Sequence, residues 1–404
     1  MLIEIHMIQN HSPANLNRDD LGAPKTCFFG GVLRSRISSQ CLKRSIRRSE
    51  EFQRLLGGKR TRQLARLIAE KVREKDVKKR AEKVLEMCGF KPKKSEGDGE
   101  GSERSKMLVY TTDQAIEEMA SLFRNGDGKD DNQLARELAE IIAKRTAVPD
   151  MALSGRMLEP DESGKKVWEE LNTTVEAALQ AAHAISTHEA RPEVDYYVAA
   201  DDIPGADAGA GYVDEAMFAS ACFYKYFSID WETLVDNLEG YGDNHKKLAA
   251  HTVGAFLRGA ALANPTGKQN SYAAHNHPDG ILVEIRNSPL SYANAFARPV
   301  GVGASIKEDG RDLISQSIAQ LGQYIYDLDN GYGKPTERFW FSPNLRCPLT
   351  VSIKAKENGK EKTREVALTE NNLGSLDELI PAVIKAIGHD WEEVKKVIVN
   401  TEVA

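Results

Sequence analysis

The order of strands and helices predicted along the chain constrains its fold most. Residues 2–8 alternate in side-chain type as a half-buried strand does, and residues 281–286 show a second clear strand pattern. Apolar residues recur at helical spacing near 245–262 and over 313–325. The order strand, helix, strand therefore occurs more than once, which favours an α+β fold of ferredoxin-like or RRM-like topology with insertions.

Other segments are assigned by the same patterns. Residues 216–228 are rich in aromatic side chains and strand-like, and residues 189–216 favour an extended, projecting hairpin. Residues 9–33 contain two prolines and several turn formers and are expected to form a long loop. Residues 91–106 have few apolar side chains to bury and are expected to form a flexible loop. Helices are expected at about 59–87, 112–123, 132–145 and 167–185, and a strand at 349–355.

A basic segment lies between Arg34 and Arg48. It carries six Lys or Arg side chains and no carboxylate, in a chain whose formal net charge is −6. Ser38 is a good N-cap type, and few helix breakers follow it before Gly57. On a helix that starts here, apolar and polar or basic side chains fall on opposite sides: Leu42, Ile46, Phe52 and Leu56 on one, and Gln40, Lys43, Arg47 and Arg54 on the other.

Two features beside this segment favour binding of a polyanion over a merely solvated basic surface. The pair Gly30 and Gly31 allows a close backbone approach, and free N–H groups at a helix start attract anions. The turn Asn17-Arg-Asp-Asp20 precedes the segment, and a solvated helix face would need neither feature. The basic segment is therefore the first candidate binding site.

Length and composition limit the class of protein. The 404 residues suffice for one large or two smaller domains with a sizeable core. No apolar run approaches the roughly 20 residues of a membrane span and no signal-peptide pattern is present, so a cytoplasmic protein without membrane partners is expected. The five cysteines include no Cys-x-x-Cys pair, which indicates neither a disulfide framework nor a zinc site.

Several polar groups could be drawn as catalytic or metal sites. They are the carboxylates of Asp19, Asp20, Asp201 and Asp202 and the imidazoles of His183, His188, His275 and His277. Adjacent carboxylates in a turn usually accept hydrogen bonds from backbone N–H groups, and no Cys or Asp at ligand spacing accompanies the histidines. His183 and His188 are expected at the end of an apolar helix. We therefore expect that this chain has no catalytic residue, binds no metal and no cofactor, and is not an enzyme.

Motifs in and after the basic segment resemble one family. They are, in chain order, Asn17-Arg-Asp-Asp20, Phe29-Gly-Gly31, Arg36-Ile-Ser-Ser-Gln40 with Leu42-Lys-Arg44, Gly155-Arg-Met157, Ala182-His-Ala-Ile-Ser-Thr-His188, Val198-Ala-Ala-Asp-Asp202 and Pro265-Thr-Gly-Lys-Gln-Asn270. Together they resemble the CasC family, the RNA-wrapping backbone subunit of the type I-E CRISPR Cascade complex. The resemblance spans residue 1 to about 231 and resumes over about 263–286.

The resemblance implies a modified RRM core, called the palm, with inserted helical fingers and a projecting thumb hairpin. On this sequence, 1–58 would begin the palm and contain the basic helix. Residues 59–187 would form the fingers, including the flexible loop at 91–106. The thumb hairpin would occupy 188–216, and 217–404 would complete the palm.

The same resemblance implies which residues contact RNA. The family's phosphate-binding segment of the palm would contain Arg18, Ser38, Gln40, Lys43, Arg44 and Arg47. A second segment, expected to face the guide, would contain Lys268, Gln269 and Asn270. Met157, Tyr197 and Val198 fall where the family presses a wedge against a kinked nucleotide. Without the resemblance, core packing would be the default interpretation of these three side chains.

The implied function is non-catalytic binding of the CRISPR guide RNA (crRNA). Copies would assemble head to tail along one crRNA and present its bases in segments for pairing with target DNA. The implied partners are the subunit that caps the crRNA 5′ end, the subunit that processes its 3′ end, and the large and small subunits of Cascade.

Three rival functions stay open at this point. An RNA-guided ribonuclease would use Asp201 and Asp202 as its acidic residues. An RNA-processing subunit would need a general base near the groove, and no single histidine is persuasive. A generic single-strand binder without partners would bind random RNA and random DNA about equally.

Overall fold

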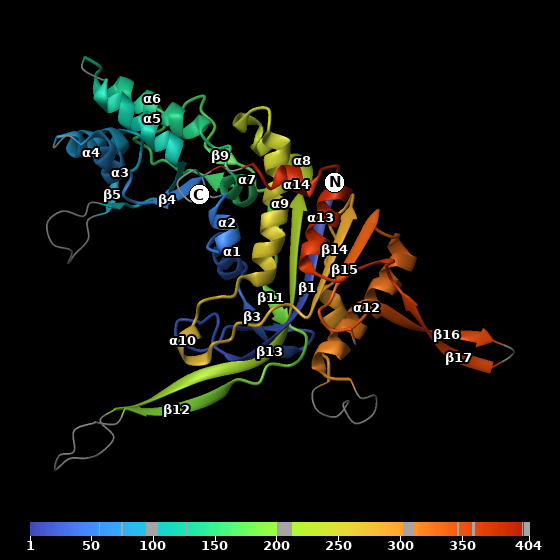
Figure 1. The fold of residues 1–404 in the computed structure, drawn as a ribbon. Helices are drawn as coiled ribbons and strands as arrows, with labels where there is room; N and C mark the ends of the chain where they lie inside the picture. Colours follow the sequence, from blue (N-terminus) through green and yellow to red (C-terminus); the bar gives the residue numbers. More distant parts are fainter. Residues whose placement is uncertain are drawn as a thin grey trace, which may run out of the picture. The chain divides into compact units, whose positions relative to one another are not determined.

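The computed structural model describes the chain except residues 56, 74–75, 94–103, 126–127, 200–211, 302–310, 346, 358–359, 398 and 400–404. The chain divides into two compact units (Figure 1). Unit 1 comprises Met1–Gln53, Gln180–Ile229 and Val253–Trp391, and unit 2 comprises Arg54–Leu179, Asp230–Thr252 and Glu392–Ala404. The expected mixture of helices with a large sheet, an α+β fold, is confirmed.

Unit 1 is built on one large sheet. The sheet follows the order β18, β15, β14, β1, β13, β11, β3, β2, and β10 and β12 also pair with β13. The strands are β1 (Leu2–Ala14), β2 (Thr26–Phe29), β3 (Val32–Ile37), β10 (Leu179–Ala181), β11 (Ala184–Ser186), β12 (Glu193–Ala199), β13 (Tyr212–Asp230), β14 (Gly280–Arg286), β15 (Glu337–Phe341) and β18 (Asn371–Leu373). The strands predicted at 2–8, 216–228 and 281–286 are therefore confirmed.

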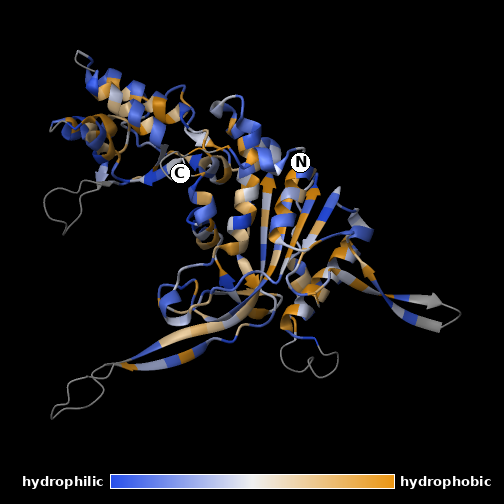
Figure 2. Cartoon of the chain, viewed as in Figure 1, coloured by the Kyte–Doolittle hydropathy of each residue, from blue (hydrophilic) through white to orange (hydrophobic). Residues whose placement is uncertain are grey.

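Unit 1 also contains several helices and one separate hairpin. The helices are α1 (Ser39–Arg47), α2 (Glu50–Gln53), α10 (Gln269–Tyr272), η2 (Ala293–Phe296), α12 (Leu313–Tyr332) and α13 (Leu376–Ala386), and α9 (His245–Leu262) contributes to both units. Strands β16 (Thr350–Glu357) and β17 (Lys360–Ala367) form a separate antiparallel pair. Figure 2 shows apolar residues along the central strands, which form the core of this unit.

Strand β1 is buried on both faces, although its alternating sequence predicts a half-buried strand. Its side chains point alternately to the two faces of the sheet. Ile3, Ile5 and Met7 are fully buried on one face, and Glu4 and His6 are fully buried on the other. The polar positions of the pattern therefore meet a buried polar network rather than solvent.

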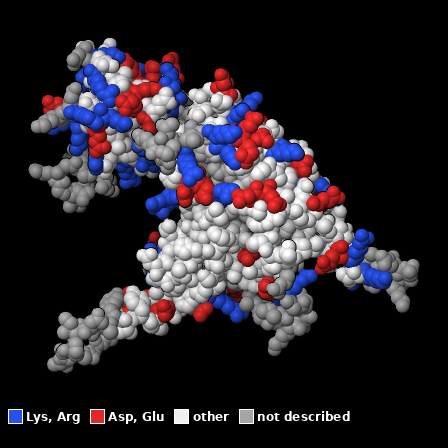
Figure 3. All heavy atoms as spheres, in the orientation of Figure 1, with Lys and Arg blue, Asp and Glu red and all other residues white. Residues whose placement is uncertain are grey.

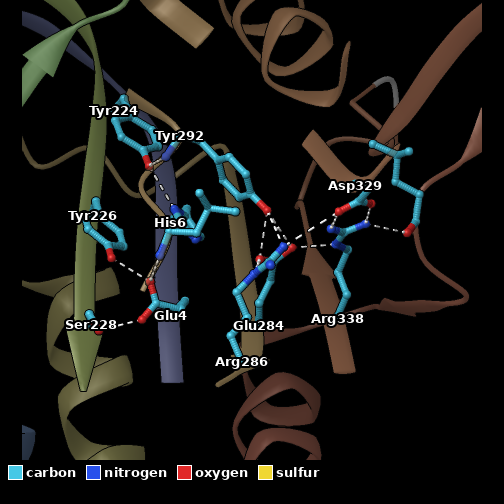
Figure 4. A network of polar contacts seen from close by, with 12 residues as sticks. Glu4, His6, Tyr224, Tyr226, Ser228, Glu284, Arg286, Tyr292, Asp329 and Arg338 are labelled. Carbon is cyan, nitrogen blue, oxygen red and sulfur yellow. Dashed lines mark hydrogen bonds and ion pairs between the residues drawn. The ribbon is translucent and has the colours of Figure 1, made fainter. Parts of the chain in front are cut away.

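That network joins four charged side chains in the interior of unit 1 (Figure 4). The Glu284 carboxylate accepts hydrogen bonds from Arg286 and Arg338, each at 2.6 Å. Two guanidinium nitrogens of Arg338 also donate hydrogen bonds to the two carboxylate oxygens of Asp329, at 2.7 and 2.8 Å. Burial disfavours the charged form of Glu284, but the attraction of Arg338 is among the interactions that outweigh it, and the carboxyl pKa lies below its ordinary value. This arrangement is a structural ion-pair network.

Hydroxyl groups contact two more polar side chains of this face, Glu4 and His6, although the buried Nε2 of His6 has no hydrogen-bond partner among the described residues. Tyr226 donates to Glu4 at 2.6 Å, and Ser228 donates to its other oxygen. His6 Nδ1 lies 2.9 Å from the Tyr224 hydroxyl. Burial lowers the pKa of His6 to about 4, so the ring is neutral near pH 7.

A long hairpin extends from the sheet of unit 1. Strand β12 lies antiparallel to the first part of β13, from the pair Glu193 and Phe218 to the pair Ala199 and Tyr212. Figure 1 shows both strands leaving the sheet together. Most of β13, from about Ala219 onward, stays within the sheet and anchors the hairpin in the core.

Unit 2 is mainly helical. Helices α3 (Leu64–Val72), α4 (Val77–Met87), α5 (Asp113–Arg124) and α6 (Asp131–Lys144) share one apolar core. The other elements are β4 (Gly58–Thr61), β5 (Pro92–Lys93), β6 (Arg104–Ser105), β7 (Val109–Thr112), α7 (Pro149–Ser154), β8 (Arg156–Met157), β9 (Thr174–Val175), α8 (Trp231–Asn237), η1 (Glu239–Tyr241) and α14 (Trp391–Val394). Figure 3 shows cations and carboxylates intermixed on the surface of these helices.

Three predictions of secondary structure are wrong. The helix expected at 59–87 begins as strand β4 and continues as the separate helices α3 and α4. The other two fail for a shared reason. The helix expected at 167–185 is replaced by turns and the short strands β9, β10 and β11. The loop expected at 9–33 contains the end of β1 and the hairpin of β2 and β3, with Gly30 and Gly31 at its turn. In both cases pairing with strands distant in sequence decides the structure.

Two further expectations, a loop at 91–106 and the absence of a membrane span, can be compared with the described residues only. The flanks of the loop expected at 91–106 pair as β5 and β6, and its centre, 94–103, lies outside the described residues. In the part of the chain that is described, every helix is too short or too polar to cross a membrane.

Candidate nucleic-acid interface

Helix α1 begins and is capped as the sequence predicts. The Ser38 hydroxyl accepts a hydrogen bond from the Cys41 backbone N–H at 3.3 Å. Leu42 and Ile46 are buried on one side of the helix. The helix ends at Arg47 and the separate α2 follows, so the basic helix is shorter than expected.

The opposite side of α1 carries the polar residues assigned to RNA. Gln40 and Arg44 are exposed, whereas Lys43 and Arg47 are half-buried. Among the described residues, neither Lys43 nor Arg44 has a carboxylate at salt-bridge distance. Arg44 and Arg47 also occupy the last turn, where cations interact favourably with the helix dipole.

The backbone N–H groups at the start of α1 are largely occupied by the protein itself. The Ser38 N–H donates to Asn17 Oδ1 at 2.8 Å, and the Ser39 N–H donates to His183 Nδ1 at 3.1 Å. With Cys41 bonded to Ser38, three donors of this helix start are used internally. The expectation of free N–H groups for an anion is therefore wrong at these three positions.

Arg34 does not belong to the basic surface. Its side chain is fully buried and donates to the carbonyl oxygens of Phe29, Ser186 and Phe296 at 3.2, 3.1 and 2.7 Å. It ties the β2–β3 hairpin to two distant segments of unit 1. The charge that the segment presents to solvent is thus smaller than its six cations suggest.

A cavity of about 530 Å³ brings together three of the segments singled out by the sequence. We name it the loop–helix cavity. Its lining residues are Leu16, Asn17, Arg18, Asp19, Asp20, Gly22, Cys41, Arg44, Ser45, Thr266 and Gly267. The turn at 17–20, helix α1 and the loop at 265–270 therefore meet at one surface, although more than 200 residues separate the first from the last.

The carboxylate of Asp19 serves the turn rather than a metal. Its Oδ1 accepts hydrogen bonds from the N–H groups of Leu21 and Ala23, both at 2.9 Å. No cluster of three or more possible metal ligands occurs in the described part of the chain. Asp201 and Asp202 lie outside the described residues.

The predicted segment Lys268, Gln269 and Asn270 leads into the short helix α10. Lys268 is half-buried and Asn270 is exposed. The Gln269 amide nitrogen donates to the carbonyl oxygens of Pro265 and Ala274 at 2.9 and 3.3 Å. Gln269 therefore closes the loop internally, and Lys268 is the cation that this segment contributes.

His183 and His188 accept hydrogen bonds from backbone N–H groups and so have structural roles. His183 and His188 flank strand β11, so their expected position at a helix end is wrong. His183 accepts from the start of α1, and burial lowers the pKa of its ring. Burial also lowers the pKa of His188, whose Nε2 accepts from the Cys222 N–H at 3.2 Å.

The three candidate wedge residues are exposed. Met157 is 69% exposed, Tyr197 44% and Val198 57%, which excludes core packing within this chain as their role. The Tyr197 hydroxyl donates to Asp214 on the paired strand at 2.9 Å. Met157 belongs to unit 2, and the other two belong to the β12–β13 hairpin of unit 1.

The sequence interpretation missed further exposed apolar side chains. On β12, Tyr196 is 70% exposed and Val194 is 44% exposed, and both lie on the opposite face of the strand from Tyr197. Because alternate residues share a face, Val194, Tyr196 and Val198 form one apolar row. The spacing of these residues in the sequence was the available signal. Phe28 is 80% exposed on β2 and gave no such signal.

The sequence matches the family described as CT1975-like protein over residues 3–370. The chain belongs to this family. No curated protein matches it in sequence.

Two solved structures are similar to this chain in fold. One chain, from a structure described as a CRISPR RNA-guided surveillance complex in a pre-nicking state, shares 27% identity with a TM-score of 0.76. The similarity covers 96% of this CT1975-like chain and 100% of the other. A second chain, from a CRISPR RNA-guided surveillance complex, shares 24% identity with a TM-score of 0.57 over the same shares, and it supports the fold alone. The resemblance to a CRISPR complex subunit drawn from the motifs is thus confirmed.

Proposed function

We propose that this protein is a non-catalytic backbone subunit of a type I-E CRISPR surveillance complex and binds the crRNA along its phosphates. The observation that carries the proposal is the loop–helix cavity, where the turn at 17–20, helix α1 and the loop at 265–270 meet. The similarity to a chain of a CRISPR RNA-guided surveillance complex supports it. The large sheet of unit 1 would be the RRM-like palm, and the helices of unit 2 the fingers.

The cavity is lined by two arginines and by the carboxylates of Asp19 and Asp20, of which Asp19 accepts hydrogen bonds from its own turn. Arg18 and Arg44 line it, and Lys43 lies on the same helix as Arg44. Cations on an open surface attract phosphate oxygens without reading base edges. Ser38 would act indirectly, because its hydroxyl caps the helix that presents these cations. Such a site holds RNA of any sequence, as a guide-binding subunit requires.

The β12–β13 hairpin would act as the thumb. Tyr197 and Val198 would press on the RNA, and aromatic and apolar side chains of this kind stack on bases without sequence preference. Met157 would be a second wedge. The exposure of all three side chains, between 44% and 69%, supports this role, because exposed apolar surface of this kind commonly marks an interaction site.

Copies would assemble head to tail along the crRNA, with each hairpin reaching the next copy. A heterologous contact of this type gives an open filament whose length the RNA determines. The crRNA bases would pair with target DNA, and the remaining Cascade subunits would cap the filament and line it.

We expect no catalysis by this chain. The Asp19 carboxylate is occupied by its own turn, and the histidines beside α1 and β11 accept backbone hydrogen bonds. These groups therefore have structural roles, whereas Asp201 and Asp202, which the rival ribonuclease would use, lie outside the described residues. Cutting would belong to another protein.

The experiment that tests the proposal measures assembly. The purified protein is mixed with RNAs of increasing length and random sequence, and the particles are sized by sedimentation velocity. We expect the number of protein copies per particle to rise in proportion to RNA length, and single-stranded DNA of equal length to be a weaker scaffold. A particle of constant size on all RNAs would contradict the filament.

A further inference from the structure

Lys225 carries a buried charge that the proposed site does not use directly. It lies on β13, its side chain is 1% exposed, and its ammonium group donates a hydrogen bond to Gln9 Oε1 on β1. Among the described residues no carboxylate forms a salt bridge with it. The titratable groups that face it are His11 on β1 and Cys41 on α1. Burying a cation without a carboxylate partner costs folding free energy, so its presence here needs an explanation.

The charge of Lys225 sets the direction of a chain of hydrogen bonds. An ammonium group can only donate, so the Gln9 amide must turn its oxygen toward Lys225. The Gln9 nitrogen then faces the opposite way and donates to Asn264 Oδ1 at 3.0 Å and to the Asn276 carbonyl oxygen at 2.6 Å. With its oxygen occupied, Asn264 donates through Nδ2 to the same carbonyl oxygen at 3.0 Å.

Asn276 is also held through its side chain. Its Oδ1 accepts hydrogen bonds from the backbone N–H and the hydroxyl of Ser12, each at 3.2 Å. Strand β1 therefore holds Asn264 and Asn276, the two ends of the loop from 264 to 276, through Gln9 and Ser12. Partners more than 250 residues apart in sequence close this loop at its base.

The loop needs such a closure because its backbone is strained. Lys268 and Ala273 adopt left-handed φ angles of 46° and 48°, which non-glycine residues adopt at a cost. Gly267 packs so closely on the chain that a Cβ atom would lie 2.6 Å from the Asn15 carbonyl oxygen. Thr266 and Gly267 line the loop–helix cavity, and Lys268 follows them directly. The closure thus fixes one wall of the cavity.

We propose that Lys225 and Gln9 are positioning residues for RNA binding: they form a buried clamp that holds the 264–276 loop in the conformation that presents Lys268 and the cavity wall to the RNA backbone. The inference rests on the proposed function. It adds that a buried ammonium group, remote from solvent, determines the affinity of the site through the polarity of three amides.

The first test replaces the ammonium group by a side chain of similar length in Lys225→Met. The thermal unfolding temperature should change little, because the gain from no longer burying a charge is offset by the loss of the donor to Gln9 Oε1. We expect RNA affinity to fall about tenfold, the size of one charge-assisted hydrogen bond. The Tyr272 and Ala273 amides, which bond to Lys268 and Gln269 across α10, should exchange hydrogen about tenfold faster in the RNA-free protein.

A second variant keeps the charge and reverses the amide. In Gln9→Glu the carboxylate can accept from Lys225 but cannot donate to Asn264 or Asn276. The clamp is broken at its other end, so the same loss of RNA affinity and of amide protection is expected. A variant at a buried position can fail to fold; one substitution removes the ammonium donor and the other removes the amide donor at a different position, so either folded variant alone tests the clamp.

The dependence of affinity on pH separates positioning from a merely structural role. Burial lowers the pKa of Lys225 to about 8, so its proton is lost as pH rises through that value. His11, with its pKa lowered to about 3, and Cys41, with its pKa raised by burial, stay neutral as pH rises from about 7 to about 8. Wild-type affinity should fall over this rise in pH, and that of Lys225→Met should not change.

The outcomes also separate this inference from the proposed function. If both variants kept the wild-type RNA affinity, amide exchange rates and pH dependence, the proposal of the clamp would be wrong. If Lys43→Ala/Arg47→Ala loses RNA while Lys225→Met and Gln9→Glu bind normally, the site stands and only the clamp is wrong. If Lys43→Ala/Arg47→Ala binds RNA normally, the proposed function fails, whereas faster loop exchange in Lys225→Met would still show the clamp itself.

Discussion

The double variant Lys43→Ala/Arg47→Ala is expected to bind RNA about 100-fold more weakly than the wild type at low salt, because two charge-assisted contacts to phosphates, each about tenfold, are lost. Lys43 and Arg47 lie four residues apart on α1, so both can follow one RNA strand. The plot of log affinity against log salt should become shallower by about 1.4, since each phosphate contact on a single strand contributes about 0.7. A fluorescence titration at several salt concentrations measures both quantities.

The matched control is Lys165→Ala/Lys166→Ala in unit 2. Both lysines are exposed, so the control removes the same charge without touching the loop–helix cavity. It should bind RNA as the wild type does with an unchanged salt slope. Equal losses in the two variants would show that only net charge matters, and α1 would then be an ordinary solvated helix.

The substitution Arg338→Met is expected to lower the free energy of unfolding by about 3–5 kcal/mol, because it leaves Glu284 and Asp329 as buried charges without their main partner. Arg338 joins both carboxylates, and the three side chains are between 0% and 6% exposed. Urea unfolding followed by near-ultraviolet circular dichroism measures the shift. Part of the loss should return at acidic pH, where protonation neutralises the orphaned carboxylates.

The control for this prediction is Arg311→Met. Arg311 lies 3.6 Å from Glu365, and both side chains are about half exposed, so its loss should cost less than about 1 kcal/mol. If Arg338→Met is as stable as the wild type, the network in Figure 4 contributes little to the stability of unit 1.

Elements with strong local signals could be predicted from the sequence. Ser38 marks the start of α1, and the apolar spacing of Leu313 to Ile325 marks α12. Residues 167–185 show why such signals fail: Ala178, Ala182 and Ile185 recur at helical spacing, yet β11 pairs with β3 and β13. Nothing local in the sequence reports partners that lie so far along the chain.

The candidate site shows the same limit. The motifs identified the three segments that meet at the loop–helix cavity, but only as separate pieces. Arg34 was grouped with the surface cations because its carbonyl acceptors, Ser186 and Phe296, lie more than 150 residues away. The bond between Gln9 and Asn276 spans 267 residues and was equally invisible. Local chemistry predicts which residue types are present, and the fold decides which of them face solvent.

RNA is proposed to lie against α1 and the 264–276 loop, and lysine footprinting of the unmodified protein tests this most directly. The protein is labelled with an amine-reactive reagent, free and saturated with RNA, and the reactivity of each lysine is measured by mass spectrometry. We predict that RNA protects Lys43 and Lys268, while Lys165 and Lys166 on unit 2 react equally in both states. Unchanged reactivity of Lys43 and Lys268 under saturating RNA would contradict the proposed interface.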